Sequence, residues 1–261
     1  MLRLSSYIAL FFLGIFLFFF PTSGSAQEIR LIMICDIKAY DIRTSVISDI
    51  DFIKSEVGYI ASVLELPLKI DLFTEDTLDE TFPEKINEIK IEEDDIVFFF
   101  FSGHGYRTEN KEDFFPYLYI TDLKKGADFS HIITTLQNKN PRFLLALADC
   151  CNNIIPEKFA PPLMDRYKCF MSVQNSDIAE YYNTLFLQTK GSILLISASP
   201  GELSWASKTG GLFTKALFYS LHQESAYSEV PDWNIILDQA CLRIVDRNIG
   251  QNPFYLLNIE K

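Results

Sequence analysis

The sequence predicts an α/β fold with a mostly parallel central sheet flanked by helices. Three observations favour this fold class. Short apolar runs are rich in aromatic and β-branched residues, other segments carry apolar residues at helical spacing, and the two kinds alternate along the chain. Such alternation is typical of parallel sheets, because each crossover between parallel strands is long enough to hold a helix.

Each element is predicted from its local pattern. Buried strands are expected where an apolar run is too short for a core helix, at residues 29–35, 96–101, 142–148 and 192–197, and a further strand is expected at residues 68–73. Residues 96–101 (IVFFFF) are the most apolar of these runs, as expected of a central strand. Helical spacing predicts helices at residues 45–66, 81–91, 129–137, 212–222 and 235–249. The stretch from 152 to 188 is the least regular, so we expect a long loop-and-helix insertion there between two halves of one sheet.

Residues 1–26 have the parts of a secretory signal peptide. Arg3 is their only charged residue, an apolar run spans residues 8–20, and Gly24 and Ala26 are small enough for the cleavage-site positions. We expect cleavage after Ala26 and export to the periplasm or the medium. The alternative is an uncleaved anchor, which is less favoured because a spanning helix needs about 20 apolar residues. No later stretch is long and apolar enough to span a membrane.

The composition narrows the possible partners. The formal net charge is −12 and no basic cluster occurs, which argues against nucleic acid and anionic membrane surfaces as partners. A cationic peptide or protein substrate remains compatible with this charge. The cysteines at 35, 150, 151, 169 and 241 are odd in number and too sparse for a disulfide scaffold. The three histidines lack metal-ligand spacing, so no metal site is expected.

Two predicted strands end in residues that can carry chemistry. Residues 102–105 read Ser-Gly-His-Gly, and residues 149–152 read Asp-Cys-Cys-Asn. Ligands of parallel sheets bind outside the carboxyl ends of the strands, so both motifs point to the same edge. A histidine near a cysteine can hold the thiol as thiolate, or take and return its proton. The alternative is an incidental histidine and a pair of buried structural thiols.

These two motifs resemble those of the caspase-like cysteine peptidases, most of all the metacaspase branch of the clan that includes caspases, gingipains and legumain. Residues 196–202 (ISASPGE) and 210–217 (GGLFTKAL) resemble the strand, loop and helix of that family's small-subunit half. Residues 251–253 (QNP) resemble the motif before its last strand. The resemblance implies a three-layer caspase-like fold over residues 27–261, with a large-subunit-like part (27–155), an irregular insertion (156–190) and a small-subunit-like part (191–261).

The resemblance also implies a role for each matched residue. His104 matches the general base or acid, and Cys151 matches the nucleophile, because the family places the thiol two residues after an acid. Cys150 is then not catalytic. Asp149 matches an acid that lines the S1 pocket and favours Arg or Lys at P1. The backbone N–H groups of Gly105 and Cys151 are the candidate oxyanion hole.

Other expectations concern the edges of this site. Ser199 and Glu202 are expected to line the substrate groove along an exposed strand edge. The family usually has a short Gly-containing stretch after the nucleophile, whereas Asn152 and Asn153 follow Cys151 here. Asparagine tolerates the positive φ that glycine supplies, so we expect the turn to be kept. Some metacaspases need calcium, but no acidic cluster here can be assigned to it, and no cofactor is expected.

The leading hypothesis is an exported endopeptidase that uses a Cys–His dyad and cleaves after Arg or Lys. Cleavage after Asp is less favoured because of Asp149, although Arg43 could supply a basic pocket. A catalytically silent binding or scaffold module is the alternative from another class. A thiol-redox role for Cys150 and Cys151 is disfavoured because a bridge between adjacent cysteines is strained. Self-cleavage is a further expectation, based on the basic residues Lys158, Arg166, Lys168 and Lys190.

Overall fold

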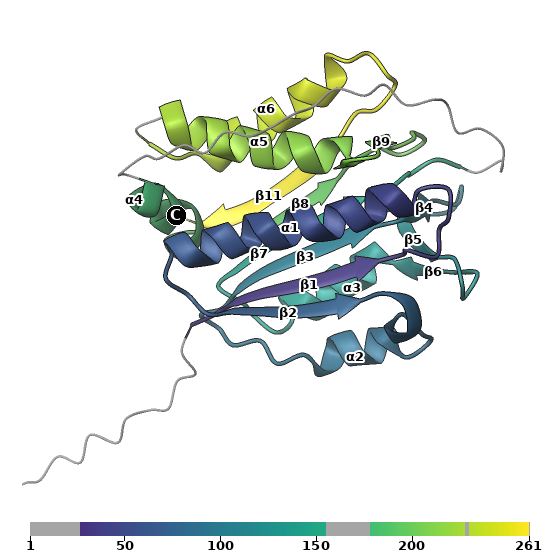
Figure 1. Ribbon diagram of the computed structural model, residues 1–261, viewed down its shortest axis with the longest axis horizontal. Helices are drawn as coiled ribbons and strands as arrows, with labels where there is room; N and C mark the ends of the chain where they lie inside the picture. The colour runs from purple at the N-terminus through teal and green to yellow at the C-terminus, as the bar shows by residue number, and fades with distance from the viewer. Residues whose placement is uncertain (1–26, 155–177, 228–229, 261) are drawn as a thin grey trace, which may run out of the picture.

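The computed structural model describes residues 27–154, 178–227 and 230–260. The expected signal peptide and residues 155–177 of the expected insertion, with Cys169, lie outside these described residues. A six-stranded sheet with the order β11-β8-β7-β3-β1-β2 forms the centre (Figure 1). Its strands are β1 (Ile29–Cys35), β2 (Leu68–Phe73), β3 (Ile96–Ser102), β7 (Phe143–Asp149), β8 (Lys190–Ile196) and β11 (Phe254–Glu260). Only β11 runs antiparallel to its neighbour, so the mostly parallel sheet is confirmed.

Helices cover both faces of the sheet and complete three layers (Figure 1). One face carries α1 (Arg43–Val63), α4 (Ile178–Tyr182), the π-helix η2 (Asn183–Leu187), α5 (Leu212–Tyr227) and α6 (Trp233–Val245). The other face carries α2 (Phe82–Glu88) and α3 (Phe129–Gln137). A 3-10 turn, η1 (Glu75–Thr77), follows β2. No helix among the described residues is long and apolar enough to cross a membrane.

The aromatic run of β3 is buried on both sides because it lies in the middle of this sandwich. Side chains alternate between the two faces of a strand. Phe98 and Phe100 pack in the core under α1, whereas Phe99 and Phe101 pack in the core with α3. All seven residues of β3 are buried. The strand therefore has no solvated face, which explains its unbroken apolar sequence.

Most predicted elements are confirmed, with shifts at their ends. The expected helix over residues 235–249 is α6, which stops at Val245. Asn248 then adopts a φ of 54°, a left-handed conformation that commonly ends helices. The expected helix over residues 81–91 shortens to the seven residues of α2. Within the expected loop-and-helix insertion, α4 and η2 occupy residues 178–187.

The sequence did not predict a second, smaller sheet beside the carboxyl end of β3. It consists of β4 (His104–Tyr106), β5 (Tyr117–Ile120) and β6 (Lys125–Asp128), which pair in antiparallel order. A two-stranded ribbon of β9 (Ala206–Ser207) and β10 (Gly210–Gly211) was also missed. Strands of two to four residues are too short to give a readable alternation of apolar and polar side chains.

Candidate active site

The register of two central strands brings His104 and Cys151 to one edge of the sheet. β3 and β7 are parallel neighbours, and Ser102 is the register partner of Asp149. His104 and Cys151 each follow two residues after these partners, so the chain carries them past the sheet side by side. The contact continues beyond both residues, because the Arg107 N–H donates to the Asn153 carbonyl at 3.1 Å. The expectation that both motifs meet at one edge is confirmed.

Gly105 lies directly against the two cysteines. A Cβ added at this position would lie 2.3 Å from the Cys151 carbonyl oxygen and 2.4 Å from Cys150 Sγ. No side chain fits at these distances, so glycine permits the close approach of β4 to the end of β7. The backbones of the two residues expected to form the oxyanion hole are therefore adjacent.

The thiol of Cys151 is held by the backbone of Ser204. The Ser204 N–H donates to Sγ at 3.4 Å, and the thiol lies 3.7 Å from the Ser204 carbonyl oxygen, which accepts from it. Burial raises the pKa of Cys151, and the negative charges of Asp149 and Asp41 raise it further, while the Ser204 N–H bond lowers it. The resting sulfur is therefore a protonated thiol at neutral pH. The sequence did not indicate Ser204.

Cys150 has a different environment from its neighbour. It is 3% exposed, and burial raises its pKa well above the ordinary value, with the charges of Cys151 and Asp149 adding to the effect. Its backbone N–H donates to Ser197 Oγ at 3.0 Å. A buried, protonated thiol is a poor nucleophile. Of the two adjacent cysteines, Cys151 is the more exposed.

His104 is partly exposed and contacts a carboxylate that the sequence did not single out. Its Nε2 lies 3.0 Å from Asp41 Oδ1, and 37% of the His104 side chain is exposed. Asp41 belongs to the loop between β1 and α1, at the same edge of the sheet. His104 and Cys151, both described in full, are not hydrogen-bonded to each other. Hydrogen bonds of a catalytic pair are often long before substrate binds, so this spacing is compatible with catalysis.

Asp149 is one of two buried carboxylates next to the cysteines. Asp149 is 7% exposed, and it accepts from Ser204 Oγ at 2.9 Å and from the Thr214 N–H and hydroxyl at 3.0 and 2.5 Å. Asp49 on α1 is 1% exposed. Burial raises the pKa of Asp49 to about 7, and the charge of Asp149 adds to the rise. The site therefore holds more buried acid than the sequence predicted, because Asp49 was missed.

Ser199 and Glu202 bond mainly to each other and to Asn252. The Ser199 hydroxyl donates to the Asn252 carbonyl at 2.7 Å, and Glu202 Oε2 accepts from the N–H groups of Asn252 at 2.7 Å and Ser199 at 3.3 Å. The Glu202 carbonyl accepts from the Asn152 N–H at 3.0 Å. These contacts tie the loop after β8 to the residue that follows Cys151. A groove-lining role for both side chains stays a prediction.

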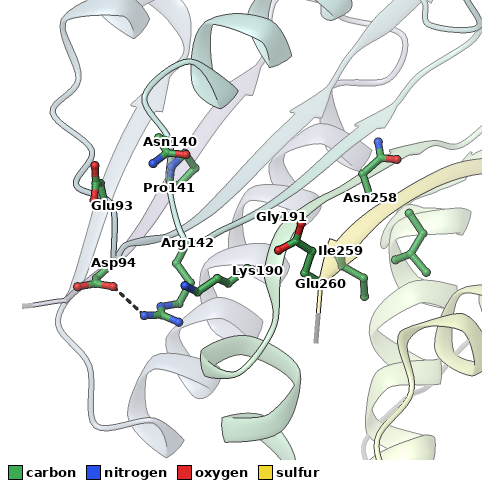
Figure 2. A pocket seen from close by; sticks show the side chains of 11 residues that line it. Glu93, Asp94, Asn140, Pro141, Arg142, Lys190, Gly191, Asn258, Ile259 and Glu260 are labelled. Carbon is green, nitrogen blue, oxygen red and sulfur yellow. Dashed lines mark hydrogen bonds and ion pairs between the residues drawn. The ribbon is translucent and has the colours of Figure 1, made fainter.

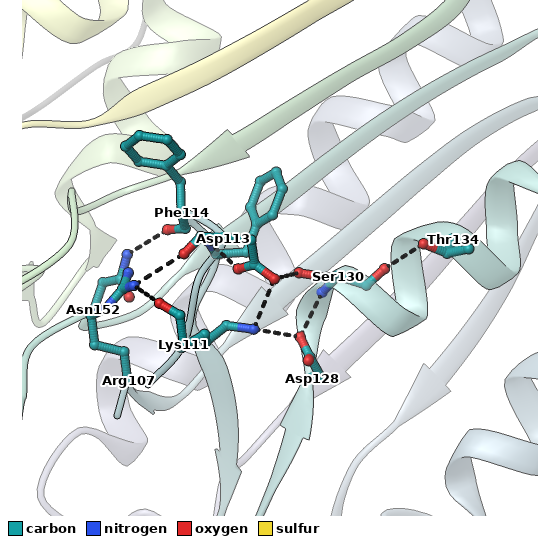
Figure 3. Close-up of polar contacts among 9 residues, drawn as sticks. Arg107, Lys111, Asp113, Phe114, Asp128, Ser130, Thr134 and Asn152 are labelled. Carbon is teal, nitrogen blue, oxygen red and sulfur yellow. Dashed lines mark hydrogen bonds and ion pairs between the residues drawn. The ribbon is translucent and has the colours of Figure 1, made fainter. Parts of the chain in front are cut away.

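Asn152 does not form the expected turn with positive φ, so that expectation is wrong. The residue is fully buried. Its side-chain amide donates to the Phe114 carbonyl at 2.9 Å (Figure 3) and to the Ala198 carbonyl at 3.2 Å. Its carbonyl accepts from the Gly201 N–H at 2.9 Å. The Asn152 side chain thus fastens the loop after Cys151 to two neighbouring loops, which a glycine could not do.

A buried lysine supports the loop that Asn152 contacts (Figure 3). Lys111 Nζ lies 2.9 Å from Asp128 Oδ1 and 3.1 Å from Asp113 Oδ2, and 3% of its side chain is exposed. Arg107 Nη2 donates to the carbonyls of Lys111 and Asp113 at 2.7 and 3.0 Å. The segment between β4 and β5 is thereby fixed beside Cys151.

A hollow of about 660 Å³ lies at the other end of the strands, where β7 and β8 begin (Figure 2). Its lining carries both signs of charge, with Arg142 and Lys190 beside Glu93 and Glu260, and Arg142 is already paired with Asp94 at 2.7 Å. None of the residues expected to be catalytic lines it. Within the described ranges, no group of three or more His, Cys, Asp or Glu side chains could hold a metal ion.

Comparisons with known proteins agree with this geometry. No curated protein sequence matches the chain. A solved structure, the crystal structure of caspase-1 from Spodoptera frugiperda, is similar with a TM-score of 0.54 at 14% sequence identity, over 88% of each chain. This likeness confirms the three-layer caspase-like fold. The model of the caspase domain, peptidase family C14, matches residues 34–253. The chain therefore belongs to the caspase domain family of cysteine peptidases.

Proposed function

We propose that this chain is a cysteine endopeptidase that cleaves after Arg or Lys, with Cys151 as nucleophile and His104 as general base and acid. The observation that carries the proposal is the fit of Gly105 against Cys151 and Cys150, because it joins the histidine segment to the cysteine segment. A glycine is needed there only if the two segments must touch. Membership of the caspase domain family supports the same chemistry.

The reaction uses groups that lie close together at this edge. His104 takes the proton of the Cys151 thiol, and the thiolate attacks the carbonyl carbon of the scissile bond. The backbone N–H groups of Gly105 and Cys151 stabilise the oxyanion. His104 then protonates the leaving amine, and water hydrolyses the acyl-enzyme with His104 as base. Before attack, the hydrogen bond from the Cys151 thiol to the Ser204 carbonyl must break, so that the sulfur can approach the substrate.

The two buried acids support a basic residue at P1. Asp49 and Asp149 repel each other, which is part of the reason that the pKa of Asp49 is raised. A guanidinium or ammonium beside them would relieve this repulsion and form charge-assisted hydrogen bonds. The charge of Lys215 already lowers the pKa of Asp49, although burial and Asp149 outweigh it. A substrate cation beside these acids would shift the pKa of Asp49 in the same direction as Lys215 does.

Hydrolysis of fluorogenic peptides tests this proposal. Matched peptides ending in Arg, Lys or Asp are offered to residues 27–261 under reducing conditions, with and without calcium, beside C151A and C150A. We expect cleavage of the Arg and Lys peptides, loss of activity in C151A and retention in C150A. Cleavage of the Asp peptide alone would overturn the specificity. Absence of turnover, together with failure of a peptide electrophile to label Cys151, would favour the scaffold function.

Export is a separate part of the proposal and rests on residues 1–26 alone. The charged start, apolar run and small residues around Ala26 support a cleaved signal peptide. Expression of the full chain in a bacterial host, followed by amino-terminal sequencing of the secreted or periplasmic protein, should give Gln27 as first residue. Recovery of intact chain with Met1 in the membrane fraction would instead indicate an anchor.

A further inference from the structure

The loop that carries Asp41 is fixed to the same frame as His104. Asp36, at the start of the loop, is 1% exposed. Its N–H donates to the Ser102 carbonyl at 3.0 Å, and its Oδ2 accepts from the Thr121 N–H at 2.8 Å. Ser102 precedes His104 by two residues, and Thr121 follows β5, whose Tyr119 is the register partner of His104. One buried residue therefore ties the loop to both strands that hold the histidine, through its backbone N–H on one side and its carboxylate on the other.

Short hydrogen bonds inside the loop define the rest of its path. The Ala39 N–H donates to the Asp36 carbonyl at 3.2 Å, and the Ile42 N–H donates to the Ala39 carbonyl at 3.1 Å. Ala39 is buried, and Ile42 leads directly into α1. The backbone on both sides of Asp41 is thus held, so its carboxylate is presented to His104 by an ordered loop.

The contact determines which ring nitrogen of His104 can act on the thiol. A carboxylate only accepts hydrogen bonds, so Nε2, 3.0 Å from Asp41 Oδ1, must carry a proton. In the neutral imidazole Nδ1 is then the unprotonated nitrogen that can accept the thiol proton. When the ring becomes an imidazolium, the same carboxylate stabilises its positive charge. We propose that Asp41 is a positioning residue for His104, so that the catalytic unit is a Cys151–His104–Asp41 triad rather than a dyad.

The exposure of the pair fits this role better than a role in stability. The Asp41 and His104 side chains are 60% and 37% exposed, and exposed ion pairs contribute little to folding. A bound peptide would cover the pair and exclude water, which strengthens the interaction during turnover. The charge of Asp41 also raises the pKa of Cys151, in keeping with its position at the same edge of the sheet.

The test compares D41N and D41A with D122N. Asp122 is a matched control because it pairs with Lys38 of the same loop at 3.6 Å, whereas His104 pairs with Asp41. The inference rests on the proposed peptidase function, so one readout is turnover of the Arg or Lys peptide. We expect kcat to fall about 10- to 100-fold in D41N and D41A. KM should change less than about threefold, and D122N should match the unmodified protein.

The second readout does not depend on activity. Nitrogen-15 NMR of labelled histidine reports which nitrogen is protonated in each of the three neutral rings, and H104Q identifies the His104 signals. We expect the Nε2–H form alone in the unmodified protein and in D122N. A mixture of both forms is expected in D41N and D41A, with His131 and His222 unchanged in every variant.

The two readouts separate this inference from the function on which it rests. A kcat of D41N within about twofold of the unmodified protein would overturn the inference, and so would a mixture of both forms in the unmodified protein. If no peptide is cut by the unmodified protein, the proposed function fails. The protonation state of His104 in D41A then decides alone whether Asp41 positions the ring.

Discussion

Asp49 and Asp149 come from distant parts of the chain and both contact Gly211. The Gly211 N–H donates to Asp49 Oδ1 at 2.9 Å, and a Cβ on Gly211 would lie 2.1 Å from Asp149 Oδ2. Two buried carboxylates are therefore kept together by a residue with no side chain of its own. The Ser102 hydroxyl satisfies the remaining oxygen of Asp49 at 2.8 Å. This pairing makes the stability of the protein sensitive to pH.

We expect D49N to flatten the pH dependence of stability between about pH 4 and pH 7. The folded-state pKa of Asp49 is about 7, above its ordinary value of 3.8. In this window the folded state holds a proton that the unfolded state has released, so stability falls as pH rises through it. Urea denaturation at several pH values should show the unmodified protein losing on the order of a few kcal/mol over this window relative to D49N.

D79N is the control for that comparison. Asp79 is an exposed aspartate whose pKa is lowered to about 2, chiefly by a hydrogen bond to Lys85. The contribution of ionised Asp79 to stability would be lost only as pH falls below about 4 towards 2. D79N should therefore keep the dependence of stability on pH that the unmodified protein shows between pH 4 and pH 7. An identical slope in D49N and the unmodified protein would contradict the raised pKa of Asp49.

G105A should displace Cys151 and lower stability. The added methyl would lie 2.3 Å from the Cys151 carbonyl oxygen, well inside the van der Waals distance, and this oxygen is backbone and cannot rotate away. Overpacking of this kind costs about 1–3 kcal/mol. Thermal unfolding and labelling of Cys151 by a peptide electrophile measure both consequences. G58A is the control, since Gly58 lies inside α1 with only Leu68 Cδ2 nearby, at 4.0 Å; it should be neutral or stabilising. Full labelling in G105A would contradict the predicted displacement.

Alkylation should separate the two adjacent cysteines. The thiolate is the reactive form, and the pKa of Cys151 lies above its ordinary value. The rate of modification of Cys151 by iodoacetamide in the resting protein should therefore keep rising above pH 8.5. Cys150, which is more deeply buried, should stay unmodified in the folded state. Peptide mapping by mass spectrometry identifies the site, and a plateau for Cys151 below pH 7 would show that its thiolate is stabilised instead.

N152A should destabilise the protein more than N153A does. Loss of the Asn152 amide leaves the carbonyls of Phe114 and Ala198 without their donor, at a cost of about 1–3 kcal/mol. Asn153 is partly exposed, and its recorded hydrogen bond uses the backbone carbonyl, which alanine keeps. N153A should therefore stay within about 0.5 kcal/mol of the unmodified protein in urea denaturation. Equal stability of the two variants would contradict the stabilising role of the Asn152 side chain.

The central sheet and the placement of His104 and Cys151 at one edge of it could be predicted because both follow from strong local patterns. Buried strands such as β3 have unbroken apolar runs, and parallel strands deliver the residues after them to one edge. The order of the strands was not needed for this conclusion. The structure adds that β3 and β7 are direct neighbours, and that their register places the two motifs at the same level.

The remaining parts of the site depend on tertiary packing. Asp49 lies on the buried face of α1 near Ile50 and Ile53, where an acidic residue is normally expected to face solvent. Its partners, Ser102 and Gly211, come from other elements. Asp41 lies in a polar loop with no periodic pattern, so only the fold shows that it reaches His104. Asn152 was predicted to act through its backbone, whereas its side chain provides the contact.

The pairing of β7 with β8 has a consequence for the integrity of the molecule. The chain leaves β7 at Asp149 and returns to the neighbouring position at Lys190. A single backbone cut in between would divide the protein into two polypeptides, with four strands of the sheet in one and two in the other. The interstrand ladder from Phe143 to Ala148 and the shared apolar cores would still join them. The nicked chain should therefore behave as a split protein whose halves co-purify until they are denatured.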